Sequence, residues 1–166
     1  LKKPVYRDLL LYGNAINNSS VVLKKRIFEN INGFSENPNL LSSEDYDAWI
    51  RYSKNTEKFL KINKTLGYYW QGGGNTSNIN LTLKSMNQIL VNYKEDIAKF
   101  SNYGSSGFNY TISRSYYSIS DFKNSIKYSK KLIFKKVPFI LYAKAIITII
   151  MSIIYYSIYV IKVKIF

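Results

Sequence analysis

Three carboxylates lie within four positions of the stretch SSEDYDAWIR, residues 42–51. They are Glu44, Asp45 and Asp47, in a chain of 166 residues whose formal net charge is +14. A helix start explains such a group by itself, because the helix dipole stabilises acidic residues in the first turn. A carboxylate held there can also act as a general base. The chain has no histidine, the commonest base, and no cysteine, which excludes thiolate nucleophiles and cysteine-based zinc sites.

Local patterns predict the elements that would position these carboxylates. The β-branched run SSVVL at 19–23 predicts a short buried strand, and KKRIFENINGF predicts a short helix that ends at Asn32-Gly33. Pro38 predicts a loop. Ser42 or Ser43 is expected to cap a helix that continues to about residue 54.

The expected helix over 44–54 has two distinct faces. Tyr46, Trp49 and Ile50 share an apolar face, whereas Asp47 and Arg51 are expected to form an i,i+4 pair at the surface. After it, residues 59–70 predict a strand pair or a bent strand. The stretch QGGGNTSN is expected to form a glycine-rich loop.

Two further regions follow, so that we expect boundaries near residues 80 and 136. The region 81–136 predicts a helix over about 81–100 and then a helical hairpin that turns at 118–121, with Ser120 or Asp121 as the second N-cap. In the region 137–166, the 25 positions between Lys136 and Lys162 are apolar apart from Lys144. A helix of that length covers about 37 Å, more than the roughly 30 Å hydrocarbon core, so it could span a membrane, lie on one, or form a core helix.

The order of the pieces in residues 14–80 resembles family-2 glycosyltransferases of the GT-A type. The matching pieces are the predicted strand with its basic end, the Asn32-Gly33-Phe34 turn, the Glu44-Asp45-x-Asp47-x-Trp49 helix and the loop from Tyr69 to Ser77. The resemblance implies an α/β fold, namely the C-terminal portion of a Rossmann-like catalytic domain, followed by the helical hairpin and the hydrophobic helix.

The resemblance also implies roles for particular residues. Asp45 would be the general base of an inverting sugar transfer, and Glu44 would help to place the acceptor. The helix dipole is expected to lower the pKa of such a carboxylate. Substrate binding would involve Trp49, which also fits a core position, together with the loop residues Gly72, Gly73, Gly74 and Asn75.

Parts of the family pattern are missing. The arginine and histidine expected in the loop are replaced within Tyr69-Trp70-Gln71-Gly72, and neither a nucleotide-binding unit nor a separate D-x-D is present. We therefore expect a fragment truncated at its N-terminus and inactive alone, with the Mg²⁺ or Mn²⁺ of the complete enzyme bound by residues outside this chain. No metal ligand is assigned here.

The implied partners are a nucleotide-sugar donor, a glycan or polyprenyl-linked acceptor, and the membrane lipid surface. The expected function is synthesis of bacterial surface polysaccharide at the cytoplasmic face of the inner membrane. Two alternatives stay open: a non-catalytic membrane-anchored adaptor, and a basic nucleic-acid binder, although no segment resembles a nucleic-acid-binding module. We therefore expect no nucleic-acid partner.

Overall fold

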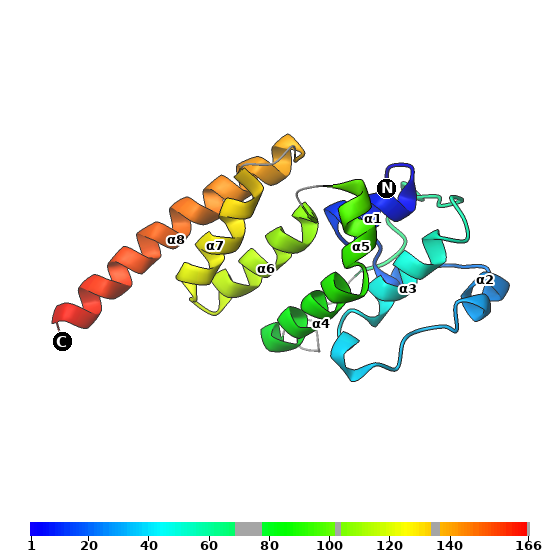
Figure 1. Ribbon diagram of the computed structural model, residues 1–166, viewed down its shortest axis with the longest axis horizontal. Helices are drawn as coiled ribbons and strands as arrows, with labels where there is room; N and C mark the ends of the chain where they lie inside the picture. The colour runs from blue at the N-terminus through cyan, green and yellow to red at the C-terminus, as the bar shows by residue number, and fades with distance from the viewer. Residues whose placement is uncertain (69–77, 102–103, 134–136, 166) are drawn as a thin grey trace.

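The computed structural model describes residues 1–68, 78–101, 104–133 and 137–165, and the side chains of the last helix as far as residue 158. Within these ranges all regular structure is helical: eight α-helices and two short 3-10 helices. The elements are α1 (Val5–Tyr12), η1 (Asn18–Ser20), α2 (Lys25–Asn30), η2 (Pro38–Leu40), α3 (Glu44–Ser53), α4 (Ile79–Asn92), α5 (Lys94–Phe100), α6 (Ser106–Ser118), α7 (Phe122–Ile133) and α8 (Phe139–Ile165). Figure 1 shows α1–α5 at one end of the molecule and α6–α8 side by side at the other.

The main core lies where α1, α3, α4, α5 and α6 meet. Tyr46 is central to it, because its hydroxyl donates to the carbonyl of Leu9 at 2.6 Å and its ring stacks on Phe108 with centroids 5.5 Å apart. The core therefore combines residues from both sides of position 80. Its other buried members include Val5, Leu10, Leu11, Leu40, Trp49, Ile50, Met86, Ile89, Tyr93, Ile97 and Ile112.

Helix α6 joins this core to the C-terminal helices. Its N-terminus crosses the end of α1 so closely that a Cβ at Gly107 would lie 2.2 Å from the carbonyl carbon of Tyr12. The hydroxyls of Ser105 and Ser106 both donate to the carbonyl of Leu11, at 3.2 and 2.9 Å. Only glycine permits this approach at residue 107, since any side chain would collide with the backbone of α1.

Small polar residues hold α6, α7 and α8 together. The Ser113 hydroxyl lies 2.6 Å from that of Ser129 and donates to the carbonyl of Ser125 at 2.9 Å. The Ser152 hydroxyl of α8 donates to that of Ser125 at 3.2 Å. All four serines are buried. Such residues let helices approach closely while satisfying their own polar groups.

The all-helical structure corrects the predicted fold class. The resemblance to GT-A glycosyltransferases implied an α/β domain with a sheet, whereas the described residues contain no strand at all. That interpretation is therefore wrong for the chain as described. The sequence pieces occur in the expected order, but the part of the chain that the structure describes does not assemble them around a sheet.

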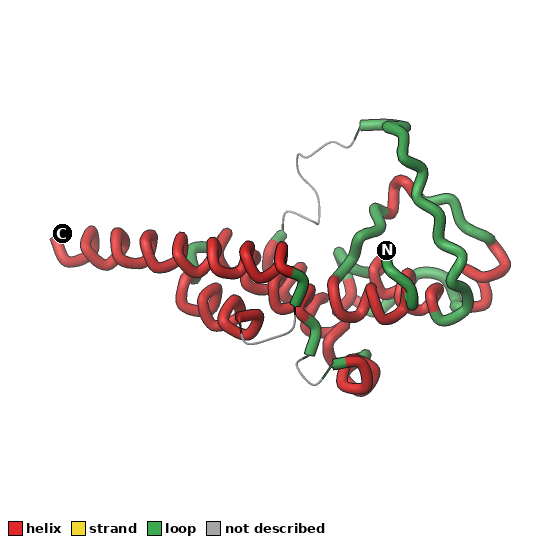
Figure 2. The backbone as a smooth tube through the Cα atoms, turned by 90° about the horizontal axis from the view of Figure 1, so that it is seen from above, coloured by secondary structure: helices red, strands yellow, loops and turns green. Residues whose placement is uncertain are grey.

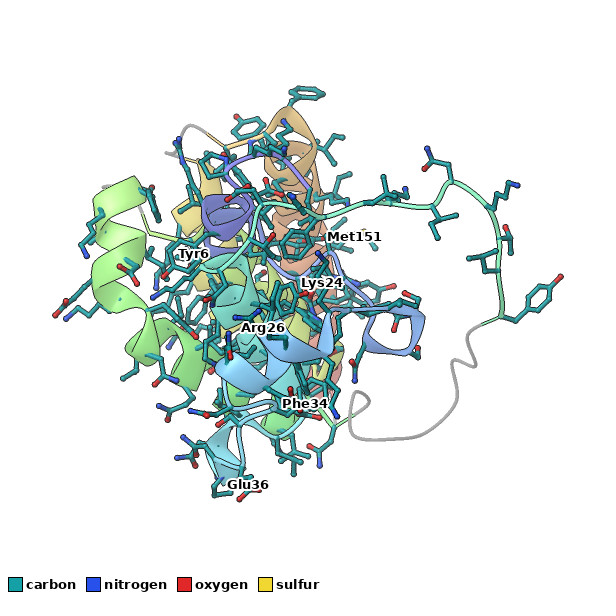
Figure 3. The ribbon with its side chains drawn as sticks, turned by 90° about the vertical axis from the view of Figure 1, so that its right-hand side faces the viewer. Tyr6, Lys24, Arg26, Phe34, Glu36 and Met151 are labelled. Atoms are coloured by element: carbon teal, nitrogen blue, oxygen red, sulfur yellow. The ribbon has the colours of Figure 1, made fainter. Side chains whose placement is uncertain are left out.

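The predicted strands fail for a physical reason. Val21 has extended dihedral angles, φ −101° and ψ 132°, as a β-branched residue favours, yet no neighbouring strand pairs with its backbone. Val22 is fully exposed. Residues 59–68 are likewise irregular, and the coil over 55–68 runs out from the body (Figures 2 and 3). Residues 69–77 lie outside the described residues.

Several local predictions are confirmed. The hairpin forms at the expected turn, and Asp121 caps α7 by accepting from the Asn124 amide at 3.1 Å. Asn32 and Gly33, both with positive φ, follow the end of α2, and the Gly33 amide bonds the Phe28 carbonyl at 2.9 Å. The expected helix over 81–100 is instead two helices, α4 and α5, which meet at Tyr93.

Candidate functional site

Asp47 is the most firmly held of the three carboxylates. Its Oδ2 accepts from Arg51 Nε at 2.7 Å, and its Oδ1 accepts from the Tyr93 hydroxyl at 2.8 Å. The Asp47 side chain is only 6% exposed. The predicted i,i+4 pair with Arg51 is thus present, but it is buried, not at the surface. Asp47 links α3 to the junction of α4 and α5 and has both oxygens occupied.

Arg51 extends the same network to the loop after α2. Its guanidinium donates to the carbonyl of Gly33 at 2.9 Å and also to the carbonyl of Ile31. These carbonyls belong to the turn at the end of α2, where the chain leaves helical geometry. The side chain of Arg51 therefore satisfies acceptors that the helix end leaves unpaired. Asp47 of the acidic stretch, through Arg51, therefore helps to hold this turn against α3.

Glu44 and Asp45 occupy the first turn of α3 and are only partly buried. Burial raises the pKa of the Asp45 carboxyl; the Tyr46 amide, which donates to it at 2.6 Å, opposes this and the charge of Glu44 adds to it. The direction is opposite to the lowering of the pKa that the helix dipole led us to expect, because the loss of water around the carboxyl outweighs the hydrogen bond from the Tyr46 amide.

The start of α3 has an unusual cap. Ser43 stands at the N-cap position, but its hydroxyl pairs with that of Ser85 at 2.8 Å and makes no capping bond. Ser42 has a positive φ of 77°. Its hydroxyl and Glu44 Oε2 are buried without a hydrogen-bond partner among the described residues. The serine that was predicted to cap the helix instead ties it to α4.

Of the other residues proposed for substrate binding, only Trp49 lies in the part of the chain that the structure describes. Trp49 is in the core, 2% exposed, and contacts Phe34 edge to face at 6.2 Å (Phe34 is labelled in Figure 3). Gly72, Gly73, Gly74 and Asn75 lie outside the described residues. Among the residues that are described, no group of three or more acidic side chains could hold a metal ion.

A hollow of about 970 Å³ lies elsewhere, between α4, α5 and the start of α6. None of the three carboxylates lines it. Its walls are apolar at Leu90, Val91 and Ile97 and carry cations at Lys94 and Lys131. This chemistry does not match a general-base site, and the carboxylate stretch is not at the hollow.

A second notable surface is the outer face of α8, which we define by six residues that turn away from the bundle. Residues spaced by three and four, Ala145, Thr148 and Ser152, are buried against the bundle. A step of two residues turns a helix by about 200° and so leads to its opposite side. The residues on that side are apolar and exposed. They are Ile140, Ile147, Ile150, Met151, Ile154 and Ile158, each between 37% and 67% exposed.

Helix α8 is long and apolar enough to cross a membrane. The qualifying part is Phe139–Ile158, of which 17% is buried inside the protein. A core helix of a soluble protein would be mostly covered. Figure 2 shows α8 as a straight rod whose C-terminal end extends beyond its neighbours. The apolar character of this helix, expected from sequence, thus coincides with a large open apolar face.

The surface next to α8 is strongly basic. The buried residues Ser125, Ser129 and Leu132 mark the packed side of α7, and its lysines are exposed on the other side. Between residues 105 and 166 the sequence has ten lysines and arginines against one acidic residue, a net +9. In the described part of this segment, the exposed lysines are Lys123, Lys127, Lys130, Lys131 and Lys144.

Sequence reasoning missed two parts of this arrangement. It assigned no element to residues 5–12, although Pro4 before an apolar run with leucines at 9, 10 and 11 is a helix-start signal. It also did not foresee Tyr93 as the partner of Asp47, which is 46 positions away. No local pattern indicates a pairing over that distance.

Comparisons with known proteins add no relative. No protein-family model matches the chain, and neither the curated proteins nor the solved structures show a significant match to it.

Proposed function

We propose that the chain is a membrane-attached helical adaptor, bound to lipid through the outer face of α8 and presenting the helices α1–α5 to the aqueous phase. The observation that carries this proposal is the exposure of a continuous isoleucine and methionine face along α8. Exposed apolar patches of this extent mark sites of membrane or protein contact. The positive charges around α8 favour the membrane.

The charge distribution supports lipid as the partner of this face. Helix α7 carries exposed lysines beside α8, and the single acidic residue of the last 62 positions, Asp121, is occupied by capping α7. Anionic lipids attract each lysine near the membrane surface by about 1 kcal/mol. Together α7 and α8 present an apolar face flanked by cations, a composition that suits attachment to a membrane surface.

The proposed location is the cytoplasmic face of the bacterial inner membrane. Six lysines fall within residues 121–136, before α8, and Lys162 and Lys164 fall near its end. The cytoplasmic leaflet carries a negative surface potential that attracts lysine-rich segments next to an apolar helix. The lysines around α8 therefore support a cytoplasmic position for α1–α7.

Sugar transfer stays a prediction without support from the fold. It depended on a resemblance whose α/β expectation is wrong, and Asp47 is engaged in structural bonds. An assay of nucleotide-sugar turnover by the chain, with Asp45→Asn as the control variant, would test it. The adaptor proposal requires no turnover.

Vesicle partitioning of paired variants tests the adaptor proposal. Ile147 and Ile154 are 59% and 47% exposed, so inserting each into lipid buries about half of a side chain, or about 1 kcal/mol each. We expect Ile147→Asn/Ile154→Asn to weaken binding to vesicles by about 30-fold. The matched control is Ile62→Asn/Leu66→Asn, at 59% and 75% exposed in the coil far from α8. Equal loss in both variants would contradict the proposal.

A further inference from the structure

We infer that α8 lies in the plane of an anionic membrane surface, with its outer face among the acyl chains and with α7 still packed along it. The inference rests on the proposed membrane attachment and adds its orientation. Length and composition alone allow α8 to cross the bilayer. The packing of α7 and α6 against α8 favours an orientation in the membrane plane over one that crosses the bilayer.

Helix α7 packs along one side of most of the stretch of α8 that would have to cross. The Ser152–Ser125 hydrogen bond joins the two helices near the N-terminal end of α7. Beyond it, the ring of Tyr155 stacks on Phe122 at 6.0 Å and meets Tyr117 edge to face at 6.3 Å. These contacts place the turn between α6 and α7 beside Tyr155, so α8 is accompanied from its start to that residue.

The uncovered remainder of α8 is too short to span. Only residues 156–165 extend past Tyr155, ten residues that rise about 15 Å. The hydrocarbon core is about 30 Å thick. A crossing would therefore have to include the part of α8 that α7 covers.

Taking that part into the bilayer would bring α7 with it. The exposed lysines Lys123, Lys127 and Lys130 lie on the side of α7 that faces away from the bundle. Lysines at the centre of a bilayer are among the most unfavourable of all substitutions. Detaching α7 from α8 instead would break the hydrogen bond between Ser152 and Ser125 and the stacking of Tyr155 on Phe122. In the plane, neither occurs, because lysine stems lie along apolar surface while their charges reach the headgroups.

The choice of lipid over a second copy of the chain follows from charge. A partner copy would bring its own basic helix α7 next to this one, and the segment 105–166 carries a net +9. Like charges at such a contact repel. An anionic headgroup layer complements them, and it also accepts the apolar face of α8, which includes Met151 (labelled in Figure 3).

Depth measurements at three positions test the orientation. The chain has no cysteine, so single probes can be attached at Ile140→Cys, Ile147→Cys and Ile154→Cys, which are seven residues apart on the outer face. Each step is about 10 Å along the helix axis. An environment-sensitive fluorophore is quenched by nitroxides placed high or low on the acyl chains of phosphatidylglycerol-containing vesicles. Lys127→Cys serves as the headgroup-level control.

An in-plane helix predicts the same shallow depth at all three positions, whereas a spanning helix predicts depths that change by about 10 Å per step. Graded depths would overturn the in-plane orientation and leave membrane attachment standing. Absence of vesicle binding would overturn both. An apolar probe environment without vesicles would mean that a second copy covers the face, and would overturn both as well.

A covalent lock checks that the bundle stays closed. Ser125→Cys/Ser152→Cys places two thiols where the hydroxyls are 3.2 Å apart, so oxidation should join α7 to α8. We expect the oxidised protein to bind vesicles as tightly as the reduced one, within about twofold. Loss of binding by more than tenfold on oxidation, restored by reduction, would show that α8 must leave α7 to insert, and would overturn the inference.

Discussion

Replacing Asp47 by alanine should destabilise the protein strongly, because this buried carboxylate links α3 to the junction of α4 and α5. It accepts from Arg51 Nε at 2.7 Å and from the Tyr93 hydroxyl at 2.8 Å, and its side chain is 6% exposed. A hydrogen bond to a charged group contributes about 1.5 to 3 kcal/mol, and removing one partner of a buried ion pair costs about 3 to 5 kcal/mol. Arg51 keeps its bonds to two carbonyls and is 26% exposed, so we expect a loss near the lower limit, about 3 kcal/mol.

The assay is thermal unfolding followed by far-UV circular dichroism in mild detergent. For a chain of this size a loss of about 3 kcal/mol lowers Tm by about 6 to 12 °C. The matched control is Glu29→Ala, which removes the carboxylate of the exposed i,i+4 pair with Lys25 and should leave Tm unchanged. If Asp47→Ala lowered Tm no more than Glu29→Ala, the structural role assigned to the acidic stretch would be refuted.

Three other predictions concern lipid binding, packing and pH. Replacing Lys123, Lys127 and Lys130 by glutamine should weaken binding to anionic vesicles by about 100-fold and have little effect on binding to neutral ones. The same change at Lys58, Lys61 and Lys64 should have little effect on either. Equal losses in the two variants would contradict the role of α7. Gly107→Ala should lower the free energy of unfolding by about 2 kcal/mol or more, because the added Cβ meets the backbone of Tyr12; urea titration measures this, and an unchanged midpoint would contradict the close crossing. Hydrogen bonds from Tyr6, Lys99 and Lys54 lower the pKa of Asp96 to about 2, so the stability that this carboxylate contributes is present above its unfolded pKa of about 4 and is lost as pH falls towards 2. Asp96→Asn should therefore flatten the dependence of the free energy of unfolding on pH between these values. An unaltered slope would count against these bonds.

Local signals in the sequence were sufficient where one short segment determines its own structure. The hairpin of α6 and α7 follows from helical periodicity and from Asp121, whose side chain caps α7 without help from distant residues. The end of α2 follows from Asn32 and Gly33, which take positive φ readily. These features depend on neighbours within a few positions.

Predictions failed where the outcome depends on distant partners. The run SSVVL does adopt extended backbone at Val21, but a strand exists only when another strand pairs with it. The burial of Asp47 depends on Tyr93, and the raised pKa of Asp45 depends on how the surrounding chain excludes water. None of these partners can be read from the residues next to the site. The local pattern therefore predicted the helix correctly, but not the burial of Asp47 or the direction of the Asp45 pKa shift.

The most direct test of membrane attachment is flotation of the whole chain with vesicles in a density gradient. The account predicts that the protein rises with phosphatidylglycerol-containing vesicles at low salt, and that high salt weakens this binding without abolishing it, because the lysines are screened and the outer face of α8 is not. A folded, dispersed protein that stayed at the bottom of the gradient with every vesicle composition would contradict the central claim.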